Sequence, residues 1–257
     1  MGYDLIEVRR DGPHVTVTLD HAAKRNALSL PMMAELQGAF EEIAESDATG
    51  VVLAASGPVF SAGHDFADMA GGDLPTIRRL FARCTDMMNA IQAAPQVVVA
   101  QVQGLATAAG CQLVATCDLA VASRGAAFAA PGGKGGLFCH TPMVAIARNL
   151  GRKRALELAL TGDPIDAATA LEWGFVNRVC GDAELAETAR ALLTRATRGS
   201  AFSKGLGKRT FYAQIELDQD RAYDYAVEVM SAGASTADGQ EGIASFLEKR
   251  RPSWRNA

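Results

Sequence analysis

The sequence predicts an α/β fold, and three observations support this prediction. Apolar strand segments alternate with amphipathic helix segments over roughly the first hundred residues. Two turns built of small residues each follow one of these strands, and the later part of the chain is mostly helical by pattern. Since α/β folds of about this size are commonly one compact unit with a small appendage, we expect one main core in this chain of 257 residues.

The first elements are a hairpin and a helix. Residues 5–8 and 15–19 are predicted to pair around the turn Asp11-Gly12-Pro13. The helix begins where Ser29 can cap it and Pro31 fits its first turn. Apolar residues then recur every three or four positions at Met32, Leu36, Phe40 and Ile43. We expect this apolar face to pack on a sheet.

The next segments repeat the pattern of strand and helix. Residues 51–55 and 97–102 are apolar and are predicted to be strands. Between them, residues 75–93 form a predicted helix that Pro95 ends. Another helix is predicted over residues 108–116. The strands are therefore expected to form a sheet with connecting helices.

The chain changes character after residue 131. Residues 132–136 are rich in glycine and are expected to form a flexible loop that borders the functional site. Further helices are predicted over residues 183–195 and 222–230. The sequence thus favours an α/β core followed by helices.

The two small-residue turns are the main indication of chemistry. The first turn comprises residues 60–65 and the second turn comprises residues 104–112. Small residues let main-chain N–H groups approach a ligand closely. Two N–H groups that converge on one oxygen form an oxyanion hole, in which each donor is worth roughly 3 kcal/mol to a reaction that develops negative charge there. We therefore expect the protein to activate a carbonyl group.

Composition and charge exclude several other classes. The net charge of −4 disfavours nucleic acid as a partner, and no apolar run is long enough to indicate a membrane span. The five cysteines show no C-x-x-C pair, so neither a disulfide framework nor a metal site is indicated. The N-terminal residues lack a signal or transit pattern, from which we expect a cytoplasmic protein.

The motifs, in their order along the chain, resemble those of the crotonase superfamily, the enoyl-CoA hydratase and isomerase group. Besides the two turns, the matching motifs are Lys24-Arg25-Asn26-Ala27-Leu28, Cys117-Asp118-Leu119-Ala120, Thr161-Gly162 and Glu241-Gly242-Ile243. The resemblance covers nearly the whole chain. It implies a crotonase-like ββα spiral core over residues 1–200 and a C-terminal helical oligomerisation region over residues 201–257.

The resemblance also implies the positions of the catalytic groups. The two oxyanion donors fall on the amides of His64 and Ala109, and the second amide lies at a helix start, where N–H groups are unpaired. The two glutamates that handle water in the hydratases fall on Gln112 and Gly132. A glutamine amide orients water but does not transfer protons near neutral pH, so we expect ordinary hydration to be weak or absent.

Three other side chains are candidates with a structural alternative. The His64 imidazole either contributes to the site or fills space beside the coenzyme A chain. His140, in the segment expected to face the acyl group, is the best replacement acid or base, against a surface or packing role. Asp68 either reaches over the site or serves in capping.

Coenzyme A (CoA) is expected as part of the substrate, an acyl-CoA thioester, and no separate cofactor or metal is expected. The family resemblance implies contacts to CoA from Lys24, Arg25, Ala27, Ala62, His64, Asp65, Phe66, Ala67 and Lys249. Lys249 belongs to a basic tail that either closes over the nucleotide, from the same or an adjacent subunit, or is solvated. The resemblance further implies a homotrimer or hexamer.

Two hypotheses of different class follow. The first is an acyl-CoA enzyme that polarises a thioester but uses unusual acid–base groups. The second is a non-catalytic protein that binds or scaffolds acyl-CoA. RNA binding is a third hypothesis, but it needs a basic face that this acidic chain does not indicate.

Overall fold

The computed structural model describes residues 2–257 and has the expected α/β class of fold. The main sheet has the strand order β1-β2-β3-β5-β7-β10, and a smaller sheet has the order β4-β6-β8-β9. The strands of the main sheet are β1 (Ile6–Asp11), β2 (His14–Leu19), β3 (Gly50–Ala55), β5 (Val97–Val102), β7 (Leu119–Ser123) and β10 (Arg178–Cys180). Those of the smaller sheet are β4 (Val59–Ser61), β6 (Leu105–Thr107), β8 (Ala127–Ala129) and β9 (Ile165–Asp166).

The main sheet is parallel except for the N-terminal hairpin. β1 pairs with β2 in antiparallel register, whereas β2, β3, β5, β7 and β10 are successively parallel. Alternate residues of β3 face opposite sides of this sheet. Val51 and Leu53 join the larger core under the helices, while Val52 and Ala54 face helix α7 (Leu185–Ala196). Burial on both faces explains why the parallel strands read as continuous apolar runs.

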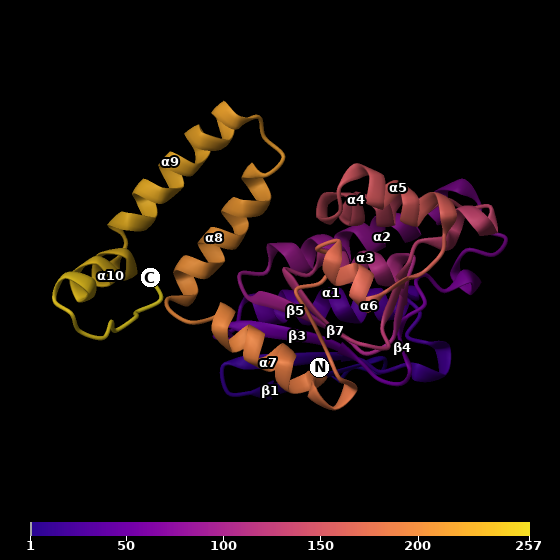
Figure 1. Cartoon of the computed structure of the whole chain (residues 1–257), viewed down its shortest axis with the longest axis horizontal. Coiled ribbons are helices and arrows are strands. Elements are labelled where there is room, and N and C mark those ends of the chain that lie inside the picture. Colours follow the sequence, from indigo (N-terminus) through magenta and orange to yellow (C-terminus); the bar gives the residue numbers. More distant parts are fainter. Residues whose placement is uncertain (1) are drawn as a thin grey trace.

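Helices cover the sheet and extend beyond it (Figure 1). The helices of the core are α1 (Leu30–Ala44), α2 (Leu74–Ala93), α3 (Ala109–Thr116), α4 (His140–Asn149), α5 (Arg152–Thr161), α6 (Ala167–Glu172) and α7 (Leu185–Ala196). Four short 3-10 helices are η1 (Ala22–Lys24), η2 (Phe66–Asp68), η3 (Pro131–Gly135) and η4 (Asp182–Glu184). We call the last three helices the C-terminal arm: α8 (Ala201–Gln214), α9 (Gln219–Ser235) and α10 (Ala237–Leu247).

The predicted elements agree with the structure at their centres and differ at some ends. Ser29 caps α1 by accepting a hydrogen bond from the Met32 amide, as expected. Helix α2 begins at Leu74, one residue before the predicted start, because the Asp73 side chain caps it by accepting a hydrogen bond from the Thr76 amide. The glycine-rich residues after 131 were expected to be an irregular loop, but they form η3. Helix α9 is much longer than the predicted residues 222–230.

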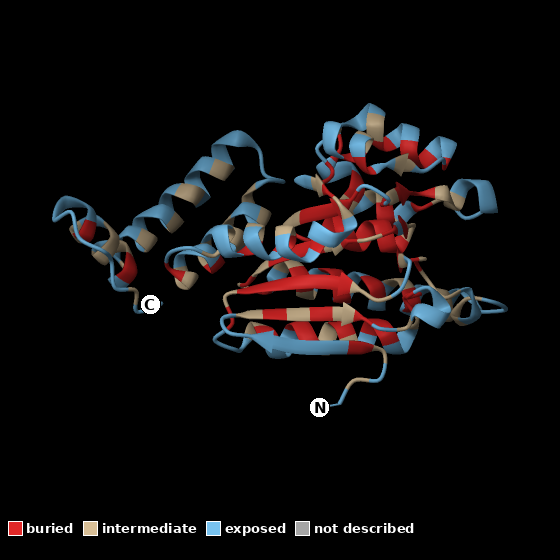
Figure 2. Ribbon diagram, turned by 60° about the horizontal axis from the view of Figure 1, so that its bottom comes forward, coloured by how far each residue is buried: buried red, intermediate tan, exposed pale blue. Residues whose placement is uncertain are grey.

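The C-terminal arm lies to one side of the core, and much of its surface is exposed (Figures 1 and 2). Asp118 connects the arm to the core. Its Oδ2 accepts a hydrogen bond from the Val98 amide at 2.7 Å and pairs with Lys208 Nζ of α8 at 2.9 Å. Its Oδ1 accepts from the Tyr212 hydroxyl at 2.8 Å. These contacts of Asp118 fix the start of the arm on the core.

Burial affects the charges and the pKa values in the cluster formed by Asp118, Lys208 and Tyr212. The side chains of Lys208 and Asp118 are only 7% and 15% exposed, so their ion pair is poorly screened by solvent. Burial and the neighbouring Asp118 carboxylate raise the pKa of Tyr212. Tyr212 is therefore a neutral hydrogen-bond donor at all ordinary pH values.

The cysteine thiols lie inside the fold. Cys84, Cys111, Cys117, Cys139 and Cys180 are all free and buried. Burial raises the pKa of Cys84 to about 12, so its thiol is inert. No helix within residues 2–257 has the length and apolar character needed to cross a bilayer.

Candidate functional site

The two small-residue turns lie side by side. Strand β4 overlaps the first turn, strand β6 lies within the second, and the two strands are parallel neighbours in the smaller sheet. Gly63 of the first turn has a φ of +82°, and a Cβ atom there would lie 3.1 Å from the amide nitrogen of Ala109. Only a residue without a side chain permits this approach. The absence of a Cβ at Gly63 therefore brings the first turn against the start of α3.

Ser61 and Gly110 hold the turns together at a second point. A Cβ atom on Gly110 would collide with the Ser61 carbonyl and lie 2.8 Å from its Cβ. The Ser61 hydroxyl donates to the Asn26 carbonyl at 2.8 Å and accepts from the Gly63 amide at 3.3 Å. The turns are thus fixed by close packing and by hydrogen bonds to a third segment.

The amides of His64 and Ala109 have no acceptor in the part of the chain that the structure describes. Ala109 is the first residue of α3, where amides have no partner in the helix and lie at the positive end of its dipole. Ala108 precedes it with a φ of 51°, a region that an L-residue occupies only at a cost. This strained residue sets the direction in which α3 begins.

Gln112 lies one helical turn beyond Ala109 and is 5% exposed. Its side-chain Oε1 is buried and has no hydrogen-bond partner in the described part of the chain. Its main-chain carbonyl accepts from the Thr116 hydroxyl at 2.9 Å. Most buried polar atoms in proteins are hydrogen-bonded, so an unpaired amide oxygen next to a candidate site indicates a place for a ligand or a water.

Gly132 has no room for a side chain. A Cβ atom there would collide with the Leu137 carbonyl oxygen and lie 2.8 Å from Cys139 Sγ. The local turn is closed by the Leu137 amide, which donates to the Gly132 carbonyl at 2.9 Å, and by the Gly132 amide, which donates to Cys139 Sγ at 3.3 Å. The fold therefore excludes an acidic side chain from this position unless the turn rearranges.

The His64 imidazole is half-buried and packs against α2. Its ring packs edge-on to Phe81, with the ring centroids 5.3 Å apart. Both ring nitrogens are buried, and neither has a hydrogen-bond partner in the chain as described. Burial lowers the pKa of His64 below its usual value, although the Leu28 carbonyl and Asp68 act in the opposite direction. The imidazole is accordingly neutral at pH 7.

His140 and Asp68 occupy different environments. His140 begins α4 as an exposed residue, and its ring lies 5.0 Å from the ring of Phe138. The Asp68 carboxylate accepts a hydrogen bond from the Leu30 amide at 2.8 Å, at the start of α1. Asp68 thus serves in capping, which is one of the two alternatives that the sequence left open. The catalytic role of His140 stays a prediction.

Most residues expected to contact CoA come from two segments that run alongside each other. The Ala62 amide donates to the Arg25 carbonyl at 3.0 Å, and the Leu28 amide donates to the Gly63 carbonyl at 2.8 Å. Lys24 and Arg25 have exposed side chains, whereas Ala27 is buried. The structure therefore places two exposed cations beside the first turn.

The residues after His64 form the short helix η2. The Asp65 carboxylate caps it by accepting from the Ala67 amide at 3.0 Å. Phe66 is 75% exposed, which is unusual for an aromatic side chain. Phe66 and Ala67 are thus accessible next to the turn, as a contact to CoA would require.

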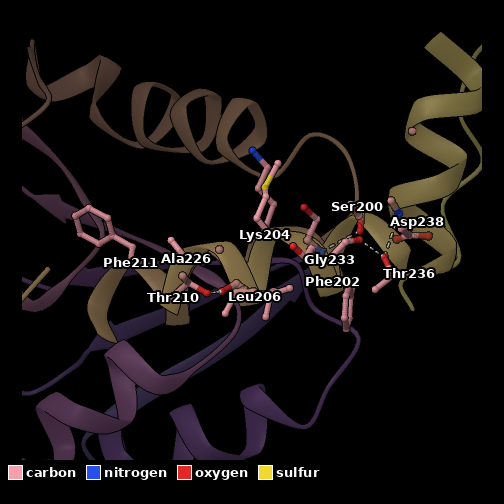
Figure 3. Close-up of a pocket in the computed structure, with 18 of the residues that line it drawn as sticks. Ser200, Phe202, Lys204, Leu206, Thr210, Phe211, Ala226, Gly233, Thr236 and Asp238 are labelled. Atoms are coloured by element: carbon pink, nitrogen blue, oxygen red, sulfur yellow. Dashed lines mark hydrogen bonds between the residues drawn. The ribbon is translucent and has the colours of Figure 1, made fainter. Parts of the chain in front are cut away.

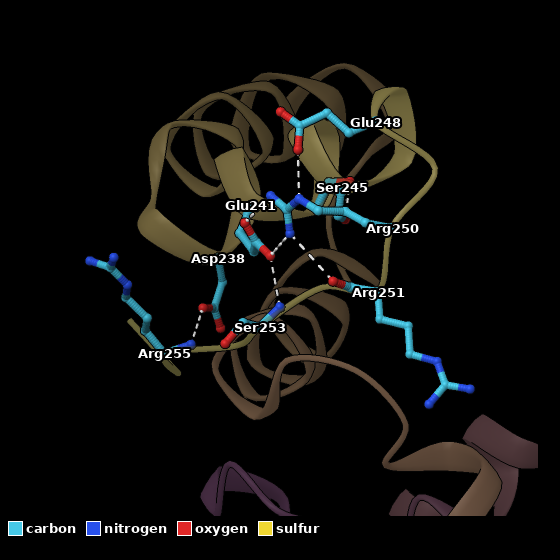
Figure 4. Close-up of polar contacts among 9 residues, drawn as sticks. Asp238, Glu241, Ser245, Glu248, Arg250, Arg251, Ser253 and Arg255 are labelled. Carbon is cyan, nitrogen blue, oxygen red and sulfur yellow. Dashed lines mark hydrogen bonds and ion pairs between the residues drawn. The ribbon is translucent and has the colours of Figure 1, made fainter.

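Lys249 is not brought to these residues within one chain. It follows α10, and Figure 1 shows α10 and β4 at opposite ends of the molecule. The tail around it is folded back on the arm, because the Arg250 guanidinium pairs with both oxygens of Glu241 at 2.6 and 2.8 Å (Figure 4). Arg250 and the Ser253 amide lower the pKa of Glu241 to about 2. Contact of Lys249 with CoA stays a prediction and requires an adjacent subunit.

A large apolar cavity lies in the C-terminal arm, away from the turns (Figure 3). It has a volume of about 1770 Å³ and lies between α8, α9 and α10. Apolar residues that line it include Phe202, Leu206, Phe211, Val227, Met230 and Phe246. Met230 is 75% exposed and Phe246 is 82% exposed, so one chain leaves this face uncovered.

Asn26 is a residue of the site that the sequence did not single out. It is fully buried, with a φ of 50°. Its side-chain nitrogen donates to the carbonyls of Ser56 and Val59 at 2.9 Å, and its Oδ1 accepts from the His21 amide at 2.9 Å. Asn26 thereby ties its own segment to the residues that lead into the first turn. Its only signal in the sequence is its place within the Lys24-to-Leu28 motif.

Comparison with known proteins identifies the family. The family model for enoyl-CoA hydratase/isomerase matches residues 14–257, so the chain belongs to this family. The mitochondrial enoyl-CoA hydratase domain-containing protein 3 of Rattus norvegicus is 44% identical over 242 residues, which span 93% of this chain and 80% of that protein. The Danio rerio protein of the same name is 43% identical and spans 93% of this chain and 84% of its own length.

Solved structures agree with this assignment. A crystal structure of enoyl-CoA hydratase from Mycobacterium smegmatis has a TM-score of 0.94 and 46% identity, covering 98% of this chain and 99% of the other. The human enoyl-CoA hydratase domain-containing protein 3 also has a TM-score of 0.94, at 42% identity, covering 98% of this chain and 100% of the other. The predicted superfamily is confirmed.

The expectation of a cytoplasmic location is wrong. The relatives named enoyl-CoA hydratase domain-containing protein 3 that are 41–44% identical to this chain are all designated mitochondrial. The expectation depended only on not finding a signal in the N-terminal residues. An absent pattern carries no positive information about the compartment.

Proposed function

We propose that the protein binds acyl-CoA thioesters and polarises the thioester carbonyl between the amides of His64 and Ala109. The observation that carries this proposal is the contact between the two turns, in which the missing Cβ of Gly63 brings the first turn to the Ala109 nitrogen. Two further features support it: both amides are without an acceptor in the described protein, and Ala109 begins α3. Such amides stabilise negative charge on an oxygen.

The candidate contacts to CoA support the same placement of the thioester. Lys24 and Arg25 are exposed cations next to the first turn, and they suit the phosphate groups of CoA. Ala62, Asp65, Phe66 and Ala67 belong to the first turn or follow it directly. The thioester would then lie between the turns, with the nucleotide end toward these residues.

Proton transfer would differ from that of a hydratase with two glutamates. Gln112 is uncharged, and Gly132 has no space for an acid. His140 is exposed and is the best remaining acid or base. We therefore propose an enzyme of this family whose ordinary hydratase activity is weak or absent.

A non-catalytic acyl-CoA-binding protein is the second candidate function. The closed turn around Gly132 favours it, because this turn leaves no room for an acidic side chain at the second of the two glutamate positions. A panel of unsaturated, hydroxy, malonyl-type and aromatic acyl-CoAs distinguishes the two functions. Turnover of any member supports the enzyme, whereas binding without turnover supports the binding protein.

The variant Ala109→Pro tests the proposed site directly. Proline removes the amide hydrogen, yet it is tolerated at the first position of a helix. We expect the Kd for an acyl-CoA, measured by calorimetry, to rise at least tenfold toward that of free CoA. Ala237→Pro, at the first position of α10, is the matched control and should leave the Kd unchanged. Equal Kd values in both variants would remove the Ala109 amide from the proposal.

The C-terminal arm supports a homo-oligomer, a trimer or a hexamer, as the second part of this proposal. Its cavity of about 1770 Å³ is lined by apolar side chains that one chain leaves exposed. Monomeric proteins rarely expose so much connected apolar surface. A second copy of the chain is the proposed occupant of this face, and sedimentation of the purified protein tests it.

A further inference from the structure

The segments that lead into the two turns are joined to each other. We call residues 56–58 the base of the first turn and residues 103–104 the base of the second turn. The Gln103 side-chain nitrogen donates to the Gly57 carbonyl at 2.9 Å. A Cβ atom on Gly104 would collide with the Pro58 carbonyl oxygen, so the two main chains touch there. The Gln103 side chain therefore ties the base of one turn to the base of the other.

Strand pairing alone fixes the relative position of the two turns only weakly. β4 and β6 have three residues each, and their register shifts between Val59 and Ser61. At such an irregularity the ladder of hydrogen bonds is locally disrupted. A short pair with a shifted register can slip, and a slip would move the His64 amide relative to the Ala109 amide. The contacts at the bases oppose this slip.

Two buried oxygen atoms at the bases lack a partner. They are Gln103 Oε1 and Ser56 Oγ, and neither forms a hydrogen bond within residues 2–257. Leu53 of β3 lies opposite Ala100 of β5 in the parallel pair. Ser56 and Gln103 each follow three residues later, so they hold equivalent positions just beyond these neighbouring strands. The alternation of side chains assigns both to the face of the sheet that α7 covers.

One water molecule suits both of these oxygens. An amide oxygen only accepts hydrogen bonds, whereas a hydroxyl group and a water both donate and accept. The nitrogen of the Gln103 amide is already bonded to Gly57, so its oxygen still needs a donor. Buried waters typically bind roughly two to four polar groups that otherwise lack partners. A water between Gln103 and Ser56 would complete the hydrogen bonding at the bases.

We infer that Gln103 is a positioning residue that holds the two turns in register, through its nitrogen on Gly57 and through a water that its oxygen shares with Ser56. This inference rests on the proposed function, because its consequence is that the His64 and Ala109 amides converge on one thioester oxygen. Gln103 acts through the main chain and not on the substrate. Its loss lets the turns shift and weakens a hydrogen bond to that oxygen. The proposed contacts to CoA around the first turn lie on one side of this junction, so CoA itself should bind as before.

Infrared spectroscopy of bound butyryl-CoA, isotope-labelled at the thioester carbonyl, tests this role. Hydrogen bonds to a carbonyl oxygen lower its stretching frequency, so the frequency should fall on binding to the wild-type protein. In Gln103→Met, which keeps the length of the side chain but not its polar atoms, the fall should be smaller. Calorimetry should show that the Kd for butyryl-CoA, divided by the Kd for CoA, rises about fivefold, which corresponds to one neutral hydrogen bond.

Two further variants separate positioning from stability. Gln96→Met is the matched control, because Gln96 is also buried, with an unpaired Oε1 and a nitrogen bonded to the Ile43 carbonyl at 2.8 Å. It precedes β5, away from the turns, so both readouts should match the wild type. Ser56→Ala removes only the partner of the water and should change both readouts less than Gln103→Met does. Gly57 is exposed, so solvent can bind its carbonyl in Gln103→Met and the fold should be kept.

The outcomes are distinct. Wild-type readouts in Gln103→Met, or an equal loss in Gln96→Met, would overturn the inference and leave the proposed function intact. Wild-type readouts in Ser56→Ala would overturn the shared water, and this variant decides the inference if Gln103→Met does not fold. A wild-type protein that binds butyryl-CoA no more tightly than CoA, without a fall in the carbonyl frequency, would instead overturn the proposed function.

Discussion

The two-turn region and the C-terminal arm differ in the kind of group that one chain leaves without a partner. Around the turns, the polar groups without a partner in the described chain include the amides of His64 and Ala109, the ring nitrogens of His64 and the Oε1 atom of Gln112. In the arm, α9 has no buried residue and the exposed groups are large and apolar. The turns lack hydrogen-bond partners for some of their polar groups, and the arm lacks a surface that covers its apolar side chains. This difference favours a small ligand at the turns and a protein surface at the arm.

The largest effect is expected where the arm joins the core. Lys208→Met leaves the Asp118 carboxylate buried without its cation, and breaking a buried pair costs about 3–5 kcal/mol. Chemical denaturation should show a loss of unfolding free energy in this range. Lys204→Met, an exposed lysine one turn earlier in α8, should change it by less than about 0.5 kcal/mol. A loss equal to that of the control would show that Asp118 does not anchor the arm.

The apolar face of the arm provides the next test. Met230→Glu puts a charge on a side chain that is 75% exposed in one chain. If a second copy covers it, burial of the methionine is worth about 1.5–3 kcal/mol per chain, and the variant should dissociate. Sedimentation velocity should then detect monomers. Glu228→Gln, an exposed neighbour in α9, should keep the wild-type assembly; a monomeric wild-type protein would refute the proposed role of this face.

Close packing of the two turns can be tested at Gly110. In Gly110→Ala, the new Cβ collides with the Ser61 backbone, and we expect a destabilisation of about 1–3 kcal/mol. Gly38→Ala is the matched control, because a Cβ there meets nothing within 4 Å inside α1. That change should stabilise the protein by up to about 0.5–1 kcal/mol. Equal thermal stabilities of the two variants would contradict the contact between the turns.

The smallest effect is expected at the tail of the arm. The pKa of Glu241 is about 2 in the folded protein, below its ordinary value of 4.5, so its pairing with Arg250 stabilises the fold above pH 4.5. This contribution is lost as the pH falls from about 4.5 toward 2. In Arg250→Gln, the melting temperature should depend less steeply on pH over this interval. Parallel pH profiles for the two proteins would exclude the linkage.

Local sequence patterns predicted the elements of the fold well where periodicity and caps agree. Ser29 and the apolar positions of α1 specify that helix on their own, and residues 97–102 coincide with β5. The short strands β4, β6, β8 and β9 were missed. They have two or three residues each and exist only because neighbouring strands pair with them, which no local pattern reports.

The candidate site was predictable in its main chain but not in its packing. Glycine and alanine at the turns indicated close approach, and the structure brings Gly63 to Ala109. No pattern in the sequence indicates that Leu137 and Cys139 fill the space beside Gly132. The sequence also could not show that Asn26 fixes the segment before the first turn, because two of its partners lie at the distant positions 56 and 59.

A crystal structure of the protein with an unreactive acyl-CoA bound tests the central claim most directly. We predict a thioester oxygen about 3 Å from both the His64 and the Ala109 amide nitrogens. A thioester bound elsewhere, or an oxygen in contact with only one of these amides, would contradict the account.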